Sequence, residues 1–478
     1  MHSQLSTLSL ASTLALLTLG QLPGTAASPT PRSTDLSSSA PVEPLRVPIK
    51  RRNGGKNKRD VESFKKQAAN MRAKYGAKTE STASSSASAS TQNEKRAGTV
   101  ELTSYQDSEW YGEIDVGTPP AGFSVVLDTG SADLILAEPN CNGCKSNTPG
   151  YSPSSSSTAS SSSQNFQITY GSGSASGTLV SDVVSIANYT EQSQTFAACS
   201  TLNNIVDGEL SGILGLGFKT IASSGATPLV QALAQDGKLP ENVFGFAFET
   251  HTFTTASSPT APGGTLTIGG VDTSAYSGSI NWIEVVQPAG YWSIPLQDIS
   301  ISNQSLGISV SQVVIDTGTT LIGVPSSIAN TIYSQIPNAQ SITLDGASGY
   351  YSFPCSQTVR ISLKFGGQEY PIEPSQFNGG AVDNFGRQCL GAIFSLTTGS
   401  NSPSIIVGDA FLTGVYSAYR FSSPEAVGFA TLGSGGSANT GSSATSSNSG
   451  TNAGCSLFTK STVTSAALAA GAVGLMMI

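Results

Sequence analysis

Two Asp-Thr-Gly triplets are the residues of this sequence whose types and spacing point most directly to chemistry. Asp128 follows the apolar run Val125–Leu127, and Asp316 follows Val313–Ile315. A short apolar run that ends in a glycine-bearing turn is typical of a strand buried on both faces. Such a strand does not hold an isolated ionised carboxylate, because an unpaired charge in an apolar interior is costly. The two triplets therefore indicate two carboxylates that face each other.

An adjacent pair of carboxylates has a defined chemistry. Two like charges a few ångströms apart do not both ionise freely, so the pair holds one proton and offers a base and an acid at the same pH. The base deprotonates a water molecule while the acid protonates or hydrogen-bonds a peptide carbonyl, which suffices for amide hydrolysis. This chemistry needs no cofactor and no metal.

The residues after each aspartate suit its support. Glycine lets the turn backbone approach the carboxylates and offer N–H groups. Ser131 and Thr319 place a hydroxyl where it would hydrogen-bond an outer carboxylate oxygen. The expected supporting residues are Thr129, Ser131 and Thr317. The turn residues expected to contact substrate are Gly130, Gly318, Thr319 and Thr320.

The triplets belong to a longer internal repeat. Asp128 is followed 87 residues later by Gly215 in Ile-Leu-Gly, and Asp316 is followed 92 residues later by Gly408 in Ile-Val-Gly. An acid-bearing strand followed at similar distance by an apolar strand ending in glycine indicates two copies of one β lobe. An approximate two-fold axis between the lobes would bring the two aspartates together.

The pattern between the triplets predicts strands and turns. Short β-rich runs recur from 97 to 432, and the serine run 152–163 is expected to be an exposed loop or hairpin approach. Helices are expected after Thr227-Pro228, ending at Gly237, and over Pro325–Ile336. The predicted fold is all-β and bilobal. Its lobes, 97–275 and 276–432, are related by a pseudo-two-fold axis, with a few short helices and a cleft between them.

Composition separates the chain into parts with different charge. At 478 residues it exceeds one ordinary domain, and only 11% of residues are charged. Up to Arg96 there are 15 Lys and Arg against 6 Asp and Glu. The remainder has 8 Lys and Arg against 25 Asp and Glu. A body with so few basic groups excludes nucleic-acid binding and suits acidic conditions, in which its carboxylates are neutralised.

The N-terminal segments are expected to be removed. Residues 1–27 resemble a secretory signal peptide, and residues 28–96 form a basic prosegment that ends at Lys95-Arg96. One helical face is expected behind Asp60 as N-cap. Its apolar residues are Val61, Phe64, Ala68, Met71 and Tyr75. We expect this helix to lie across an acidic cleft as an inhibitor. The alternative is a disordered basic arm, and release by a dibasic processing protease or by self-cleavage is left open.

The C-terminal segments predict attachment to a membrane through lipid. Residues 433–454 form a Ser/Gly-rich stalk, and residues 455–478 combine a spacer with a short apolar tail. This arrangement is typical of a GPI-attachment signal, with the anchor residue in 449–454. A short tail anchor and simple disorder are the alternatives.

Cysteines and sequons fit a secreted protein. Cys141 with Cys144, and Cys355 with Cys389, are expected to form disulfides, whereas Cys199 is expected to be a buried free thiol. No second cysteine pair stands at metal-ligand spacing, so a zinc site is not expected. Asn188 and Asn303 begin N-glycosylation sequons.

Over about 97–432 the chain resembles the pepsin family of aspartic endopeptidases. The two triplets, the Ile-Leu-Gly and Ile-Val-Gly partners and the run Tyr170–Gly173 stand in family order. The resemblance implies that Tyr170, Gly171 and Ser172 belong to a β-hairpin flap that closes over substrate. It supports the same two disulfides. With the stalk and tail, it extends to the anchored, yapsin-like branch of fungal cell surfaces. The family has Trp where Ile135 stands, which puts the position of Tyr170 in doubt.

These features predict a secreted aspartic endopeptidase at the cell surface or cell wall. It would be a monomer that cleaves polypeptides in acid and is kept latent by its own prosegment. A catalytically silent binding protein of pepsin fold and a structural cell-wall mannoprotein are the alternatives. The cleavage preference stays open. Val126, Ile213 and Thr319 would favour apolar substrate residues, whereas Asp133 would favour basic ones.

Overall fold

Strands dominate the computed structural model. The structure describes residues 61–75, 98–105, 109–170, 173–206, 210–250, 260–383, 385–398 and 403–433. The expected signal peptide, the Lys95-Arg96 site, the stalk and the GPI signal lie outside these ranges. Among the described residues, no helix has the length and apolar character needed to cross a membrane. The all-β prediction is confirmed, since twenty-six strands accompany five α-helices in these ranges.

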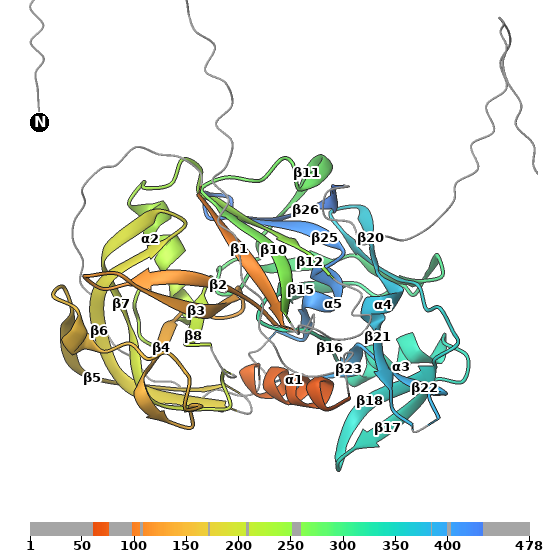
Figure 1. Ribbon diagram of the computed structural model, residues 1–478. Coiled ribbons are helices and arrows are strands. Elements are labelled where there is room, and N and C mark those ends of the chain that lie inside the picture. The colour runs from red at the N-terminus through yellow and green to blue at the C-terminus, as the bar shows by residue number, and fades with distance from the viewer. Residues whose placement is uncertain are drawn as a thin grey trace, which may run out of the picture. The chain divides into compact units, whose positions relative to one another are not determined.

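Strands from both halves of the chain form one large sheet (Figure 1). In spatial order its strands are β11 (Tyr276–Glu284), β26 (Ala426–Leu432), β25 (Val415–Arg420), β9 (Val243–Phe248), β10 (Thr260–Ile268), β1 (Gly98–Tyr105), β2 (Glu109–Val116), β3 (Ala121–Asp128), β8 (Gly212–Gly215), β4 (Leu134–Asn142), β7 (Tyr189–Asn203), β6 (Gly173–Ile186) and β5 (Ser160–Tyr170). Because β25 pairs with β9, the C-terminal segment is hydrogen-bonded directly to the N-terminal half.

The remaining strands form three smaller sheets in the C-terminal half. The first contains β12 (Ser293–Leu296), β15 (Val310–Ile315), β24 (Ile405–Val407), β16 (Ile322–Val324) and β23 (Ile393–Ser395). The second contains β14 (Gln304–Ser305), β13 (Asp298–Ile301), β19 (Ile361–Phe365) and β20 (Gln368–Ile372). The third contains β17 (Gln340–Leu344), β18 (Ala347–Pro354), β22 (Gln388–Gly391) and β21 (Asn378–Ala381).

The strand pairing reproduces the internal repeat. In one half β3 runs parallel to β8, which places Asp128 opposite Gly215, and β4 runs antiparallel to β8. In the other half β15 runs parallel to β24, and β16 runs antiparallel to β24. The same three-strand unit therefore carries each Asp-Thr-Gly triplet.

Burial of the acid-bearing strands differs between the two halves. Val313, Val314 and Ile315 are fully buried, as expected for a strand covered on both faces. Val125 and Leu127 are buried as well, but Val126 between them is only half-buried. The expectation of burial is therefore confirmed for the run Val313–Ile315 and wrong for Val126 in the run Val125–Leu127.

The three predicted helices form, with one difference in capping, and two short helices occur that the sequence does not predict. The predicted ones are α1 (Val61–Lys74), α2 (Leu229–Gln235) and α3 (Ser326–Ser334). Two shorter ones are α4 (Pro374–Phe377) and α5 (Asp409–Leu412). In α2 the N-cap position belongs to Pro228 rather than Thr227, because the proline backbone is still extended. Gly237 ends α2 at a φ of 62°, the left-handed conformation that glycine adopts without strain.

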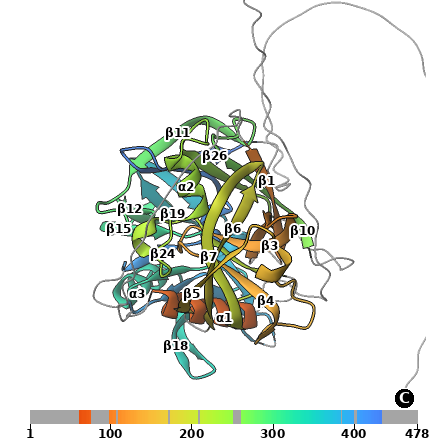
Figure 2. The same cartoon turned by 90° about the vertical axis from the view of Figure 1, so that its left-hand side faces the viewer.

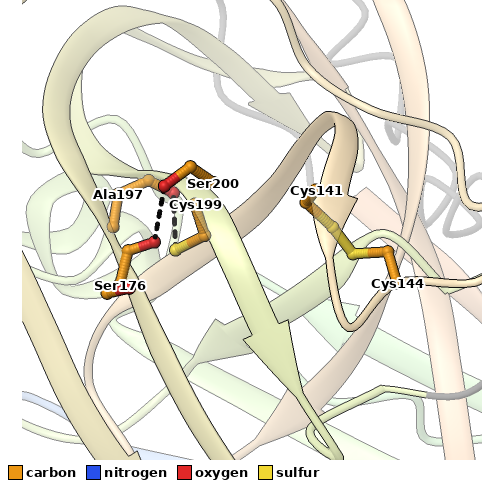
Figure 3. The surroundings of a disulfide bond; sticks show 6 residues. All are labelled: Cys141, Cys144, Ser176, Ala197, Cys199 and Ser200. Atoms are coloured by element: carbon orange, nitrogen blue, oxygen red, sulfur yellow. Dashed lines mark hydrogen bonds between the residues drawn. A yellow bond between two sulfur atoms is a disulfide. The ribbon is translucent and has the colours of Figure 1, made fainter.

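The expected disulfides and the free thiol are present. Figure 3 shows the Cys141–Cys144 disulfide together with Cys199. Cys141 and Cys144 close the turn at the end of β4, and Cys355 is linked to Cys389 in β22. Cys199 is buried in β7, where burial raises the pKa of its thiol to about 12. A thiol with so high a pKa stays protonated, so Cys199 packs as a small apolar residue.

Both sequons are on the surface, and the serine run is not an interdomain linker. Asn188 and Asn303 are exposed in turns, each with a positive φ. The serine run contains a short 3-10 helix, Pro153–Ser155, and continues into β5. It is therefore an approach to a hairpin, as the sequence predicts.

Candidate active site

The two aspartates are buried and converge on one atom. Asp128 is the last residue of β3 and Asp316 follows β15, and their exposed fractions are 3% and 0%. The Lys74 ammonium lies 2.7 Å from Asp128 Oδ1 and 3.0 Å from Asp316 Oδ2. Two carboxylates from strands 188 residues apart in the chain therefore lie on either side of a single Nζ atom.

Two threonines cross-link the turns that hold the aspartates. The Thr129 N–H donates to Thr317 Oγ1 at 3.1 Å, and the Thr317 N–H donates to Thr129 Oγ1 at 3.0 Å. Each hydroxyl donates in turn to a main-chain carbonyl of the opposite strand. Thr129 bonds Ile315 at 2.9 Å, and Thr317 bonds Leu127 at 2.7 Å. Four buried hydrogen bonds therefore fix the position of one triplet relative to the other.

Each carboxylate also receives two hydrogen bonds from its own turn. Gly130 N–H donates to Asp128 Oδ1 at 2.9 Å, and Ser131 Oγ donates to Oδ2 at 2.5 Å. Gly318 N–H donates to Asp316 Oδ1 at 2.9 Å, and Thr319 Oγ1 donates to Asp316 Oδ2. Backbone N–H groups thus serve one oxygen of each acid, and hydroxyls serve the other.

The glycines of the triplets are required by the opposite carboxylate. A Cβ at Gly130 would lie 2.5 Å from Asp316 Cγ, and a Cβ at Gly318 would clash with the Asp128 carboxylate. No rotation of a side chain relieves these contacts, because both carboxylates are held by hydrogen bonds. Glycine is therefore the residue that allows the two acids to approach.

The glycines of the two partner strands serve the turns themselves. A Cβ at Gly215 would clash with the Ala132 backbone, and one at Gly408 would clash with the Thr319 carbonyl. Close packing lets Gly215 N–H donate to Asp133 O at 3.0 Å. The glycines of the Ile-Leu-Gly and Ile-Val-Gly motifs thus allow these strands to pack directly against the turns that carry the triplets.

The pKa values of the two carboxyls are shifted in opposite directions. Burial raises the pKa of Asp128, with a further increase from Asp316 and an opposing effect of Lys74. Burial acts in the same direction on Asp316, but the Lys74 charge and hydrogen bonds from Asp128, Thr319 and Tyr75 lower the pKa of Asp316 overall. Asp128 is therefore the carboxyl of the pair that is protonated more readily, and Asp316 the one that ionises more readily.

Comparison with known proteins agrees with this geometry. A family model described as eukaryotic aspartyl protease matches residues 109–432. The chain belongs to the eukaryotic aspartyl protease family. It is therefore an aspartic endopeptidase. The matched residues run from β2 to β26.

Fungal and animal proteases are among its relatives. The chain is 43% identical to major aspartyl peptidase 1 of Cryptococcus neoformans var. grubii serotype A over 364 residues, which are 73% of this chain and 74% of that protein. It is 35% identical to an aspartic protease of Phaffia rhodozyma over 70% of this chain and 80% of that protein. It is 32% identical to gastricsin of Mus musculus over 67% of this chain and 80% of that protein.

The prosegment helix of this protease lies against the catalytic body (Figure 1, Figure 2). Helix α1 contacts β5 in the N-terminal half and β21 in the C-terminal half. The expected apolar face is confirmed, since four of its five residues are buried: Phe64, Ala68, Met71 and Tyr75. Val61 is only half-buried, and the expected N-cap Asp60 lies outside the described residues.

Lys74 and Tyr75 are site residues that sequence reasoning missed. The sequence indicates Tyr75 only as part of the apolar face, and Lys74 is one of many basic residues in the prosegment. Tyr75 Oη donates to Asp316 Oδ2 at 2.8 Å, and the Tyr75 ring lies 5.6 Å from the Tyr291 ring. A lysine next to the last apolar position of a helix expected over an acidic pair is the signal that would have indicated the contact.

The expected flap is described only in part. Tyr170 ends β5 and pairs with Gly173 at the start of β6, so a hairpin forms where the resemblance implies it. The side chain of Tyr170, together with Gly171 and Ser172, lies outside the described residues. Their contact with substrate stays a prediction.

Ile135 occupies a buried position beneath the flap hairpin. It has no exposed surface and packs in an apolar cluster with Phe166 and Ile168 of β5 and with Ala197 of β7. The strand that ends at Tyr170 therefore packs, through Phe166 and Ile168, in an apolar cluster that includes Ile135.

Asp133 has a structural partner instead of a substrate. It is buried, and its carboxylate accepts hydrogen bonds from Ser223 N–H at 2.8 Å and Ser224 N–H at 2.9 Å. The Ser224 hydroxyl donates to the same carboxylate. The suggestion that Asp133 selects basic substrate residues is therefore wrong, because its oxygens hold the 223–224 loop.

Thr320 is buried too, and its carbonyl accepts from Ala410 N–H at 2.8 Å.

The threonine cross-link predicts a specific stability effect. Thr317→Ala removes one donor and one acceptor from a buried network, so the free energy of unfolding should fall by about 2–4 kcal/mol. Thr317→Ser keeps the hydroxyl and should retain most of the stability. Chemical denaturation of each variant measures the difference. Thr331→Ala, which removes an exposed hydroxyl bonded to Ser327 O within α3, is the matched control. Equal losses for Thr317→Ala and Thr331→Ala would contradict the structural role of the cross-link.

Proposed function

We propose that the chain is a secreted, acid-active aspartic endopeptidase whose dyad is Asp128 and Asp316 and whose prosegment keeps it latent. The observation that supports this most strongly is the convergence of both buried carboxylates on Lys74 Nζ. Lys74 marks a point from which one small polar group reaches both acids. In the activated enzyme a water molecule bound between the carboxylates would be the nucleophile.

The hydrogen bonds of the site suit this reaction. One carboxylate accepts a proton from the water while the protonated partner donates to the peptide carbonyl, so the shared proton changes sides during attack. The donors from Gly130, Ser131, Gly318 and Thr319 hold the acids in place, which lowers the reorganisation that the reaction requires. A silent binding protein would have no need of two intact acids in this arrangement.

The prosegment would inhibit by occupying this position. Burial alone would lower the pKa of Lys74, but the charges of Asp128 and Asp316 raise it, so the ammonium stays protonated between them. Tyr75 blocks the same site, since its hydroxyl donates to Asp316. Removal of residues 28–96 after Lys95-Arg96 would give the mature enzyme. Sequencing the N-terminus of the activated form distinguishes this processing from self-cleavage elsewhere.

Apolar side chains close to Asp128 support a preference for apolar substrate residues next to the scissile bond. Val126 and Ile213 pack on the apolar cluster of Ile135, close behind the Asp128 turn. We propose that these residues and Thr319 line the central pockets, with Tyr170, Gly171 and Ser172 closing over the substrate. The enzyme would act as a monomer, without cofactor or metal.

The dyad proposal predicts loss of activity on neutralising either acid. Asp128→Asn or Asp316→Asn should abolish cleavage of an unfolded protein between about pH 3 and 5, because the pair then lacks either its base or its shared proton. Cleavage by the unchanged enzyme should be blocked by pepstatin. Asp409→Asn, at a buried aspartate of α5, is the control for removing a buried charge. Full cleavage by either dyad variant would overturn the mechanism.

The prosegment proposal predicts release in acid. Contact with Lys74 opposes the rise of the Asp128 pKa and helps to hold the pKa of Asp316 below its ordinary value. A carboxyl with a lowered pKa stabilises the docked state above its ordinary pKa, and this stabilisation is lost as the pH falls through the lowered value. Docking of α1 should therefore weaken below about pH 4, near the ordinary Asp pKa.

Variants of the full-length chain test whether Lys74 holds the prosegment helix over the dyad. Lys74→Gln should let the full chain bind pepstatin at pH 6, where the unchanged chain does not. Lys65→Gln removes an ion pair to Asp345, which is 74% exposed, and should have little effect. An equal effect of both substitutions would show that the general basic charge of α1, rather than Lys74, maintains latency.

Surface attachment is proposed from the stalk 433–454 and the tail 455–478. A GPI-specific phospholipase should release the protease from intact cells, and a chain ending at Gly433 should appear in the medium without that treatment. Retention of the truncated chain on cells would contradict lipid anchoring through the C-terminal signal. A structural mannoprotein would give the same release but no proteolysis.

A further inference from the structure

A second basic residue of α1 lies in a built site away from the dyad. Arg72 Cζ is 4.8 Å from the centroid of the Tyr350 ring and 5.1 Å from that of Phe394. The two ring centroids are 6.3 Å apart, and the ring planes differ by 22°. The guanidinium therefore rests on two nearly parallel rings, the arrangement in which aromatic faces attract a cation.

Hydrogen bonds fix the orientation of this guanidinium. Arg72 Nη2 donates to Ser348 O at 2.8 Å, and Nη1 donates to Tyr350 Oη at 3.2 Å. We call Tyr350, Phe394 and the Ser348 carbonyl the Arg72 site. It uses a ring face, a hydroxyl and a carbonyl, with no carboxylate, so it recognises the planar donor pattern of arginine more closely than the point charge of lysine.

Glycine shapes the Arg72 site. Gly349 has a φ of 92°, which turns the chain within β18, and a Cβ there would lie 3.2 Å from Arg72 Nη2 and 3.0 Å from Ser395 Cβ. Two other glycines of this half also make room for α1 side chains. A Cβ at Gly323 would clash with Met71 Sδ, and one at Gly379 would lie 2.5 Å from the Phe64 ring. These three glycines lie on the surface of the C-terminal half that α1 covers, and we call this surface the groove.

The groove belongs to the enzyme body and not to the prosegment. Tyr350 lies in β18 and Phe394 in β23, so both remain when residues 28–96 are removed. The same groove adjoins the dyad, because Lys74 reaches the aspartates from the end of the helix that carries Arg72. A peptide bound at the dyad and extending over the C-terminal half would replace α1 in the groove.

We propose that the Arg72 site is a substrate subsite, and that the mature enzyme prefers polypeptides carrying an arginine in the segment bound over the C-terminal half. Arg72 would occupy it in the latent form as a stand-in for the substrate side chain. This inference rests on the proposed function, since it assigns a substrate class to the same cleft.

Matched peptides test the subsite on the activated enzyme. Short peptides with an uncleavable reduced bond carry arginine, lysine or citrulline at each position in turn beside that bond. Citrulline has the shape of arginine without its charge. At one position arginine should bind roughly five- to thirty-fold tighter than citrulline, the range expected for a partly to fully desolvated cation on aromatic rings. Lysine should fall between them.

Variants locate the preference. Phe394→Leu removes one ring and no charge, so the ratio of arginine to citrulline affinities should fall towards one. Tyr350→Phe keeps the ring and should retain most of the ratio. The control is Phe385→Leu, at a ring that also contacts an arginine, Arg387 at 4.6 Å, but is 76% exposed. With cleavable peptides, the same ratio should appear mainly in KM.

The outcomes separate the two proposals. Equal binding of arginine and citrulline at every position overturns the subsite, and continued cleavage of the same peptides would leave the proposed function intact. An arginine preference that survives Phe394→Leu also overturns the assignment, because the charge would then be recognised elsewhere. Arginine preference in binding without cleavage of any peptide would support the subsite and contradict the proposed protease mechanism.

Discussion

The burial of two carboxylates side by side is the constraint on which the rest of this structure depends. Removing an ion from water costs several kcal/mol or more unless hydrogen bonds or an opposite charge replace the solvent. Here each acid receives one backbone N–H and one hydroxyl from its own turn, and a single ammonium serves both. The glycines and hydroxyl residues around the dyad follow from this need.

The duplicated three-strand unit provides the rigidity that such a site requires. The acid strands β3 and β15 each pair with a glycine-ended strand, and the threonine cross-link joins the two units at their closest point. Because four buried hydrogen bonds span this point, a shift of one half relative to the other would break several at once. The active centre is therefore held by the two halves jointly, while β25 and β9 connect them along the large sheet.

Two kinds of contact join the prosegment helix to the rest of the chain. Lys74 forms ion pairs with the dyad, whereas Arg72 packs on aromatic rings and donates a hydrogen bond to a carbonyl of the C-terminal half. Both residues lie on one helix, whose apolar face is buried between them. The docked helix is thus held by a contact that depends on the ionisation of the carboxyls and by others that do not.

The sequence alone determined the all-β repeat, the dyad, the supporting turn residues and the prosegment helix. These follow from local rules: apolar runs ending in glycine, matched spacing of two motifs, and a helical period of apolar residues over 61–75. The cysteine pairs were also predictable, since few pairings were available.

Only the tertiary structure decided which polar residue meets which. Asp133 is close to Asp128 in sequence, yet its carboxylate holds the 223–224 loop, because the backbone N–H groups of that loop needed an acceptor. Lys74 is marked in the sequence only by its position beside Tyr75, and nothing local distinguishes Arg72 from the other basic residues of α1. Their roles depend on helix rotation and on partners from 54 to 278 residues away in the chain. Long-range contacts of this kind are set by packing of the whole chain, which a local sequence pattern does not specify.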